Sequence, residues 1–213
     1  MTGDYHGSRL TEDVRRTGVW RALWHYFFRH RIRPDDCVLD LGAGYGDFVN
    51  SVQARRRIAV DTWPGMKEHL AEGVEAIIGR ADQLDTIEDG AVDYAFASNL
   101  FEHISQDDLT RVLASLERVL SAKGRLTILQ PNYRYAYREY FDDYTHISVY
   151  SHESLPDFLR AHGWDVLEVH PRFLPLSVKS RLPTASFLIG LYLRMPFRPL
   201  GKQMLVVAQP RRA

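Results

Sequence analysis

Three glycines at alternate positions, Gly42, Gly44 and Gly46, follow a short apolar run in the sequence. A second apolar run ends on an acid, Asp61, fifteen residues after Gly46. Glycine allows the backbone to turn sharply and to approach a ligand where a Cβ atom would clash. The carboxylate of Asp61 offers two oxygens that can accept hydrogen bonds from a pair of ribose hydroxyls. The pattern predicts a nucleotide-binding crevice at the carboxyl ends of two neighbouring strands.

The elements that must position these residues alternate along the chain between strands and helices. Expected strands cover residues 38–41, 57–60, 74–78, 91–97, 126–129, 164–169 and 204–208. Expected helices cover residues 48–54, 105–120 and 151–162. This alternation predicts an α/β fold with a parallel sheet and right-handed crossovers.

The spacing of the glycines distinguishes between two kinds of nucleotide site. A dinucleotide fingerprint, G-x-G-x-x-G, that starts at Gly42 needs its third glycine at position 47, which is Asp47. The pattern is instead Asp40-x-Gly42-x-Gly44-x-Gly46, which resembles the first motif of class I S-adenosylmethionine-dependent methyltransferases. Two alternatives stay open. One is a nicotinamide-dependent oxidoreductase, which Asp47 disfavours. The other is a catalytically silent regulatory or scaffold subunit, which stays open because a protein can bind the cofactor without turnover.

The resemblance extends from Val38 to Leu129 and implies a Rossmann-like class I methyltransferase fold, with a mostly parallel seven-stranded sheet and helices on both faces. It implies S-adenosyl-L-methionine as the cofactor and S-adenosyl-L-homocysteine as the product. Residues 79–82 are similar to the stretch that contacts adenine, with Asp82 accepting from its exocyclic amine, and 93–103 resemble the turn below the methionine part. The cofactor-binding residues implied are Asp40, Gly42, Ala43, Gly44, Gly46, Asp61, Thr62, Ala81, Asp82, Asn99 and Leu100.

The C-terminal part is similar to a bacterial subgroup of these enzymes, the methyltransferase type 11-like proteins. The similarity rests on residues 130–135, on Asp142-x-x-x-His146, and on 171–175 and 179–183. Members of the subgroup resemble accessory enzymes of glycan or lipid-linked saccharide synthesis. The resemblance therefore implies a small-molecule or glycan acceptor.

Motifs of other methyltransferases that this sequence lacks narrow the class of methyl acceptor further. Nucleic-acid amino-methyltransferases carry an acid or Asn, two prolines and an aromatic residue after the fourth strand, where this chain has Ser98-Asn99-Leu100-Phe101. A cytosine-carbon enzyme needs a Pro-Cys nucleophile, and the only cysteine, Cys37, precedes the first strand. Lys+Arg and Asp+Glu are equal at 27 each, so no basic excess indicates a nucleic-acid partner. These observations favour an oxygen atom as the methyl acceptor. The sequence has no Cys/His cluster at ligand spacing, so it does not indicate a metal site.

A hydroxyl acceptor is a poor nucleophile, so a positioned base should raise the rate, and imidazole titrates near neutral pH. His146, after the fifth strand, and His103, after the fourth, are the candidate catalytic bases. Asp142 or Asp143 is a candidate for orienting His146, and the alternative is a solvated acidic pair. A structural alternative exists for each histidine: His146 would tether its loop, and His103 would cap the following helix.

Tyrosines are frequent after the fifth strand, and three of them are candidate substrate-binding residues: Tyr133, Tyr137 and Tyr144. They would clamp an acceptor by stacking, or else pack their segment against the domain. A further helix is expected to begin at residues 11–13, and Tyr5 and Arg9, which precede it, are candidates for contacting the carboxylate of the cofactor.

A length of 213 residues with 45% hydrophobic content fits a single α/β domain. We expect a helical flank over 1–34, a cofactor-binding half over 35–130 and an acceptor-side half over 131–213. No signal peptide is recognisable, and no apolar run reaches the ~18 residues of a membrane-spanning helix, which predicts a cytoplasmic protein. The sequence favours no particular oligomeric state.

The zero net charge conceals an uneven distribution, because no acid follows Glu168. The apolar segment 171–200 carries several cations, among them Lys179, Arg181 and Arg194. Two interpretations are open for the stretch 182–195. It is a helix that covers the sheet, or it is an interfacial element that brings the protein to the inner face of an anionic membrane.

Overall fold

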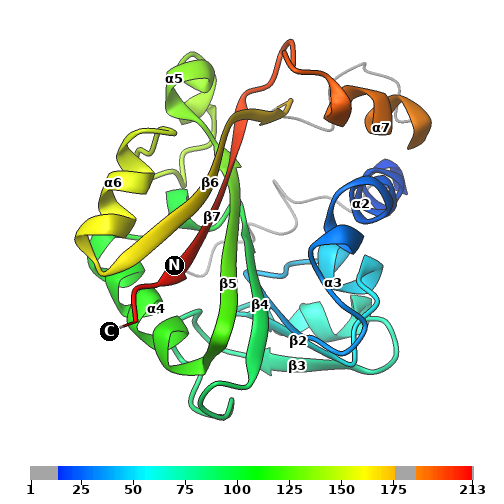
Figure 1. Cartoon of the computed structure of the whole chain (residues 1–213), viewed down its shortest axis with the longest axis vertical. Coiled ribbons are helices and arrows are strands. Elements are labelled where there is room, and N and C mark those ends of the chain that lie inside the picture. Colours follow the sequence, from blue (N-terminus) through cyan, green and yellow to red (C-terminus); the bar gives the residue numbers. More distant parts are fainter. Residues whose placement is uncertain (1–13, 176–185, 213) are drawn as a thin grey trace.

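One seven-stranded sheet organises the protein, in the order β3-β2-β1-β4-β5-β7-β6 (Figure 1). The computed structural model describes residues 14–175 and 186–212. Tyr5, Arg9, Lys179 and Arg181 lie outside the described residues. The strands are β1 (Cys37–Leu41), β2 (Arg56–Asp61), β3 (Val74–Ile78), β4 (Val92–Ser98), β5 (Leu120–Pro131), β6 (Trp164–Leu174) and β7 (Gln203–Pro210).

Helices and shorter turns connect the strands. The α-helices are α2 (Val14–Tyr26), α3 (Asp47–Ser51), α4 (Gln106–Val119), α5 (Tyr133–Ala136), α6 (Ser154–Ala161) and α7 (Ser186–Arg194). The 3₁₀ turns are η1 (Phe28–His30), η2 (Pro64–His69), η3 (Phe101–His103) and η4 (Tyr140–Asp142). No helix within the described ranges is both long and apolar enough to cross a membrane.

The sheet is mostly parallel, as the alternation of strands and helices predicted. β1 pairs in parallel with β2 through Leu39↔Ile58 and with β4 through Leu39↔Ala95. β7 is antiparallel to both β5 and β6. Because parallel strands end at the same edge of a sheet, the residues that follow β1, β2 and β4 are brought together there.

Helix α4 covers one face of the sheet together with α6. The hydroxyl of Ser105 accepts a hydrogen bond of 3.1 Å from the backbone N–H of Asp108, and this N-cap begins the helix. The buried side chains of α4 recur at helical spacing: Leu109, Val112, Leu113, Leu116 and Val119. They pack with Leu155 and Leu159 of α6 against the strands.

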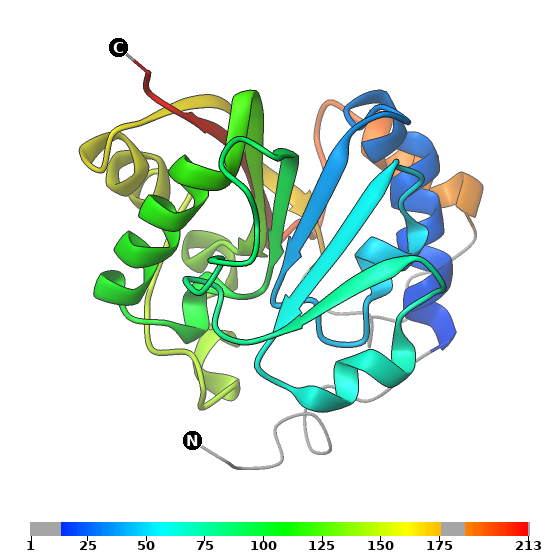
Figure 2. The ribbon, with the colours of Figure 1, turned by 90° about the horizontal axis from the view of Figure 1, so that it is seen from below.

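The opposite face is covered by α2, α3 and α7 (Figure 2). Phe28, Phe48 and Phe96 form an aromatic cluster there, with ring centroids 4.0 to 5.4 Å apart. α7 packs on α2 so closely that a Cβ atom at Gly190 would lie 2.7 Å from the ring of Tyr26. Helices therefore flank both faces of the sheet, as expected.

Some boundaries differ from those expected. α3 ends at Ser51 and not at residue 54, because Val52 adopts an extended conformation (φ −77°, ψ 139°). α4 ends at Val119, and β5 begins directly at Leu120. The helix expected from residue 151 begins at Ser154.

Candidate active site

The glycine turn after β1 has a backbone conformation that other residues rarely adopt. Gly42, Gly44 and Gly46 have φ angles of 68°, 53° and 70°. A Cβ atom at Gly42 would lie 3.0 Å from Cδ1 of Leu100, and one at Gly46 would lie 2.7 Å from Cδ2 of Leu70. Glycine is therefore required here for its left-handed conformation and for the close approach of neighbouring chain segments.

Asp61 lies beside this turn, as the sequence pattern indicated. Its Oδ2 atom accepts a hydrogen bond of 2.8 Å from the backbone N–H of Gly44, and Oδ1 accepts one of 2.9 Å from Trp63. A carboxylate oxygen has two lone pairs, so each oxygen can accept a further hydrogen bond. Thr62, the next residue, is exposed, and Ala43 packs at the start of the turn.

Asp40 is oriented toward the interior and is only 3% exposed. Its carboxyl group accepts a hydrogen bond from the backbone N–H of Val49, which fastens α3 to β1. Burial raises the pKa of Asp40 well above its usual value, and the negative charges of Asp61 and Asp47 add to the effect. The buried carboxyl of Asp40 therefore holds the start of α3 next to β1.

Asp82 belongs to a network of ion pairs between the loop after β3 and helix α4. Arg80 contacts its carboxylate at 2.9 Å and Arg111 contacts it at 3.2 Å. Both guanidinium groups also pair with Asp108. The hydrogen bond from Arg80 is the largest cause that lowers the pKa of Asp82. The network holds Ala81 and Asp82 in place, and their contact with adenine stays a prediction.

The turn after β4 contacts both the glycine turn and strand β7. Asn99 has a positive φ of 49°, a conformation that asparagine tolerates better than most residues. Its side-chain oxygen accepts a hydrogen bond of 2.9 Å from Nε2 of Gln203 in β7. Leu100, directly after it, lies against Gly42. No motif in the sequence indicates a role for Gln203, because its strand is far from this turn in the chain.

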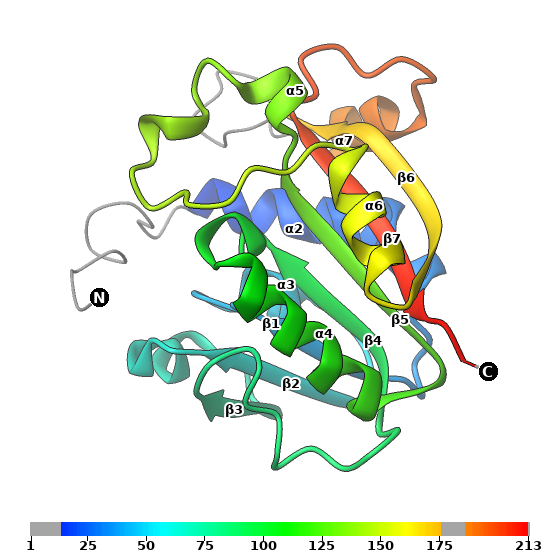
Figure 3. The same cartoon turned by 90° about the vertical axis from the view of Figure 1, so that its left-hand side faces the viewer.

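The segment after β5 is hydrogen-bonded to the turn after β4 and brings the two candidate bases together (Figure 3). The backbone N–H groups of Ile147 and Ser148 both donate to the carbonyl oxygen of Glu102, at 2.9 and 3.1 Å. The imidazole ring of His146 consequently lies beside that of His103, with the ring centroids 4.8 Å apart.

The hydrogen-bond partners fix the tautomer of each imidazole. Thr145 donates its hydroxyl proton to Asp143 at 2.6 Å, so its oxygen accepts from Nδ1–H of His103 at 2.9 Å. Nδ1–H of His146 donates to the carbonyl oxygen of Tyr140 at 2.6 Å. Both rings therefore carry the proton on Nδ1 and the basic lone pair on Nε2.

These bonds correct one expectation. Asp143 was a candidate for orienting His146, but its carboxylate holds Thr145 and thereby orients His103. Burial, together with the neighbouring His146, lowers the pKa of His103 to about 4. Burial also lowers the pKa of His146. Both imidazoles are neutral at neutral pH.

Glu102 is the residue of this site that the sequence analysis missed. Its side chain is fully buried, and neither carboxyl oxygen accepts a hydrogen bond from any residue in the described part of the chain. Oε1 lies 4.0 Å from Nε2 of His103, and burial raises the pKa of Glu102 to about 8. The available signal was an acid placed between Phe101 and His103, one of the candidate bases.

The tyrosines differ in their surroundings. Tyr133 packs edge-on against the ring of Tyr140, with the centroids 5.2 Å apart, and Tyr140 is fully buried. Tyr137 and Tyr144 are exposed, at 55% and 70%. Tyr140, which was assigned no role, supports the segment by donating its hydroxyl to the carbonyl oxygen of Ser148 at 2.6 Å.

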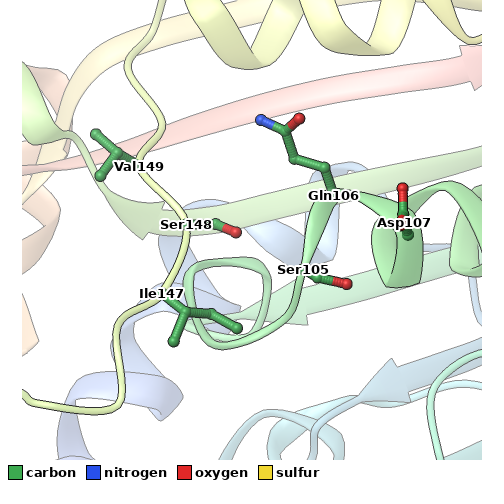
Figure 4. Close-up of a pocket in the computed structure, with 6 residues that line it drawn as sticks. All are labelled: Ser105, Gln106, Asp107, Ile147, Ser148 and Val149. Atoms are coloured by element: carbon green, nitrogen blue, oxygen red, sulfur yellow. The ribbon is translucent and has the colours of Figure 1, made fainter.

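An open pocket lies where this segment crosses the start of α4. Figure 4 shows its lining: Ser105, Gln106, Asp107, Ile147, Ser148 and Val149. Two of these residues, Ile147 and Ser148, carry the N–H groups that bond to Glu102. The pocket therefore borders the residues that directly follow His146.

Comparison with known proteins identifies the family. Residues 12–169 match the family model described as a methyltransferase domain. A search of the curated proteins finds no match. The chain is similar to a SAM-dependent methyltransferase from Archaeoglobus fulgidus, with 20% identity, 91% of this chain and 93% of that chain covered, and a TM-score of 0.65.

Two further solved structures share the fold. One is the Burkholderia thailandensis 1,6-didemethyltoxoflavin-N1-methyltransferase, with 19% identity, 98% of this chain and 84% of that chain covered, and a TM-score of 0.62. The other is a chain in the complex of the Haloferax volcanii Trm112 methyltransferase activator, with 16% identity, coverage of 95% and 100%, and a TM-score of 0.67. The chain belongs to the methyltransferase domain family, as a class I S-adenosylmethionine-dependent methyltransferase.

Proposed function

We propose that this protein transfers the methyl group of S-adenosylmethionine to a hydroxyl oxygen of a small molecule or a saccharide, including a lipid-linked glycan. The observation that carries the proposal is the position of the two imidazoles. Leu100 lies against Gly42, and the backbone N–H of His103 donates to the carbonyl oxygen of Leu100 at 3.0 Å. His103 therefore belongs to the turn that borders the glycine turn, and the ring of His146 lies beside it, with the centroids 4.8 Å apart.

The glycine turn and Asp61 fit the cofactor. The left-handed glycines let the backbone of the turn approach a ligand closely, and Asp61 has lone pairs for the two ribose hydroxyls. S-adenosylmethionine supplies a methyl group on a sulfonium, with a thioether as leaving group. The remaining residues that we propose as cofactor contacts are Asp40, Ala43, Thr62, Ala81, Asp82, Asn99 and Leu100.

The chain's own contribution is to hold the acceptor and to accept its proton. Holding two reactants in line can account for ~7–11 kcal/mol of a reaction barrier. We assign the proton acceptor to Nε2 of His146, because His103, with a pKa of about 4, is the weaker base. Asp143 acts through Thr145 on His103 and is a positioning residue. Tyr133, Tyr137 and Tyr144 border the same segment and are the proposed acceptor contacts.

Helix α7 supports a second part of the proposal, peripheral contact with an anionic membrane surface. Gly190 and Leu193 of α7 are buried, and α7 packs on α2, which supports the interpretation that α7 covers the sheet. Phe187, Leu191 and Phe197 are exposed, at 60 to 67%, and Arg194 lies among them. An exposed apolar surface flanked by a cation is typical of interfacial helices and would bring the enzyme to a lipid-linked acceptor.

The experiment for the proposed function uses radiolabelled S-adenosylmethionine and extracts of host glycans and lipids. We expect label in a saccharide or small-molecule fraction, and mapping of the product should locate the methyl group on oxygen. A methylated nitrogen or carbon would contradict the oxygen acceptor. Tight binding of S-adenosylhomocysteine without labelling of any fraction would favour the catalytically silent subunit.

A further inference from the structure

Glu102, His103 and His146 bring three metal-ligating groups together below the surface. One carboxylate oxygen and two imidazole nitrogens, one from each residue, all lie within 4.8 Å of one another. The carboxylate is fully buried, whereas the imidazoles are partly exposed. We propose that these three residues bind a divalent transition-metal ion such as Zn²⁺ at the edge of the methyl-transfer site.

The hydrogen bonds around the imidazoles are those of ligating histidines. A metal-bound histidine almost always donates its other ring N–H to a carbonyl or to a carboxylate, which fixes the ring. His146 donates Nδ1–H to the carbonyl oxygen of Tyr140, and His103 donates Nδ1–H to Thr145. Thr145 is itself held by Asp143 at 2.6 Å. Both rings thus direct their lone pairs through Nε2.

The buried carboxylate supplies the second, independent observation. A buried polar group without a hydrogen bond is costly, and a charged one more so. Neither oxygen of Glu102 has a hydrogen-bond partner among the described residues, although two backbone N–H groups bond to its own carbonyl oxygen nearby. A cation bound between Glu102 and the two imidazoles would offset the free-energy cost of this buried carboxylate, which has no hydrogen-bond partner among the described residues.

The donor set indicates the class of ion. Two imidazoles and one carboxylate are a ligand set of zinc sites that retain an open position, and Mn²⁺, Fe²⁺ and Co²⁺ also accept it. Mg²⁺ and Ca²⁺ prefer ligand sets made of oxygen. Bonds of about 2.0–2.2 Å would require the three ligand atoms to lie closer to one another than they do in this structure.

The use of the ion rests on the proposed function. A divalent ion lowers the pKa of a bound hydroxyl. In the metal-loaded enzyme His146 would be a ligand, and the ion-bound acceptor hydroxyl, with its pKa lowered, would release its proton to water as the methyl group is transferred to its oxygen. The open positions would favour acceptors with neighbouring oxygens, such as the adjacent hydroxyls of a saccharide.

The test is calorimetric titration of the chelator-treated full chain with Zn²⁺, repeated with Co²⁺ and Mg²⁺. We expect one saturable Zn²⁺ per chain, similar behaviour of Co²⁺, and much weaker binding of Mg²⁺. Glu102→Gln and His146→Ala should abolish saturable binding. Thr145→Val, which removes the hydroxyl between His103 and Asp143 but no ligand atom, should lower affinity by ~10–100-fold.

Two surface variants are matched controls, because His30 and Glu117 are exposed. His30→Ala and Glu117→Gln should bind Zn²⁺ like the wild type. The temperature of unfolding gives a second measurement, since an ion that binds only the folded state raises it. Zn²⁺ should raise it for the wild type and for both controls, but not for Glu102→Gln.

Absence of saturable Zn²⁺ binding by the wild type would overturn the proposal, as would unchanged binding by both Glu102→Gln and His146→Ala. If Glu102→Gln does not fold, His146→Ala and Thr145→Val still decide the question. Titration with S-adenosylhomocysteine in the presence of chelator reports the cofactor site alone. Failure of metal binding and failure of the methyltransferase proposal therefore give different results.

Discussion

The Oδ2 atom of Asp61 accepts a hydrogen bond of 2.8 Å from the backbone N–H of Gly44. This bond joins the last residue of β2 to the middle of the turn after β1. The acid thus stabilises the turn while its remaining lone pairs are available for a ligand. Asp61 should therefore affect both the conformation of the turn and the affinity for the cofactor.

Replacement of Asp61 should weaken cofactor binding. Asp61→Ala removes the acceptors for the ribose hydroxyls and for Gly44, and each buried group left unpaired costs ~1–3 kcal/mol. We expect the dissociation constant for S-adenosylhomocysteine, measured by calorimetry, to rise by about 5–150-fold. Asp35→Ala, an exposed acid in the loop before β1, is the control. Affinity equal to that of the wild type would refute the assigned site.

Two glycine substitutions should affect stability in opposite directions. Gly46→Ala places a side chain at φ +70°, which costs ~1–2 kcal/mol, and its Cβ atom displaces Leu70. Gly18→Ala lies in the exposed part of α2, with nothing within 4 Å of the new Cβ atom, and should gain ~0.5–1 kcal/mol. Denaturant unfolding of the two variants measures both changes. Equal effects would show that the left-handed conformation at Gly46 is not required.

The buried carboxyl of Asp40 should make stability depend on pH. Its pKa is raised in the folded state, so the unfolded chain ionises first, above its usual value of 3.8. The wild type should lose stability relative to Asp40→Asn as the pH rises from about 4, by at most about 1.4 kcal/mol per pH unit. Asn keeps an oxygen for the N–H of Val49. A difference that stays constant between pH 4 and 7 would contradict the raised pKa.

His146 should be needed for turnover but not for cofactor binding. Its Nε2 atom carries the basic lone pair, so His146→Ala should reduce methyl transfer by ~10²–10⁴-fold. Affinity for S-adenosylhomocysteine should change little, and His30→Ala should retain full activity. Full activity of His146→Ala would transfer the role to His103 or leave it to positioning alone. Loss of activity on chelation, restored by Zn²⁺, would identify His146 as a ligand.

Helix α7 should bind anionic vesicles at low salt. Arg194 lies three residues after the exposed Leu191 on α7, so a cation and an apolar side chain share one face of the helix. Co-sedimentation with anionic vesicles should exceed that with neutral vesicles, and it should weaken as salt shortens the Debye length below ~10 Å. Arg194→Glu should weaken it as well. Arg160→Glu, the same change on α6, should leave it unaltered, and equal sedimentation with both vesicle types would exclude this attachment.

The periodicity of the sequence predicted which elements form but not where they end. The strand 74–78 and the amphipathic face of α4 were predicted correctly, because both follow from side chains close together in the chain. β5 and β6 extend to Pro131 and Leu174, well beyond the expected 129 and 169. Both extensions pair with Gln203 of β7, a partner that lies far away in the sequence.

The sequence by itself determined the glycine turn and its acid. Gly42, Gly44 and Gly46 encode their own left-handed turn, and the end of the next strand places Asp61 beside it. Only the tertiary structure decided the grouping of Glu102, His103 and His146. His146 is 43 residues beyond His103, and bonds from Ile147 and Ser148 to the backbone of Glu102 bring it there. Local patterns encode turns and periodicity, whereas contacts between distant segments form only when the chain packs.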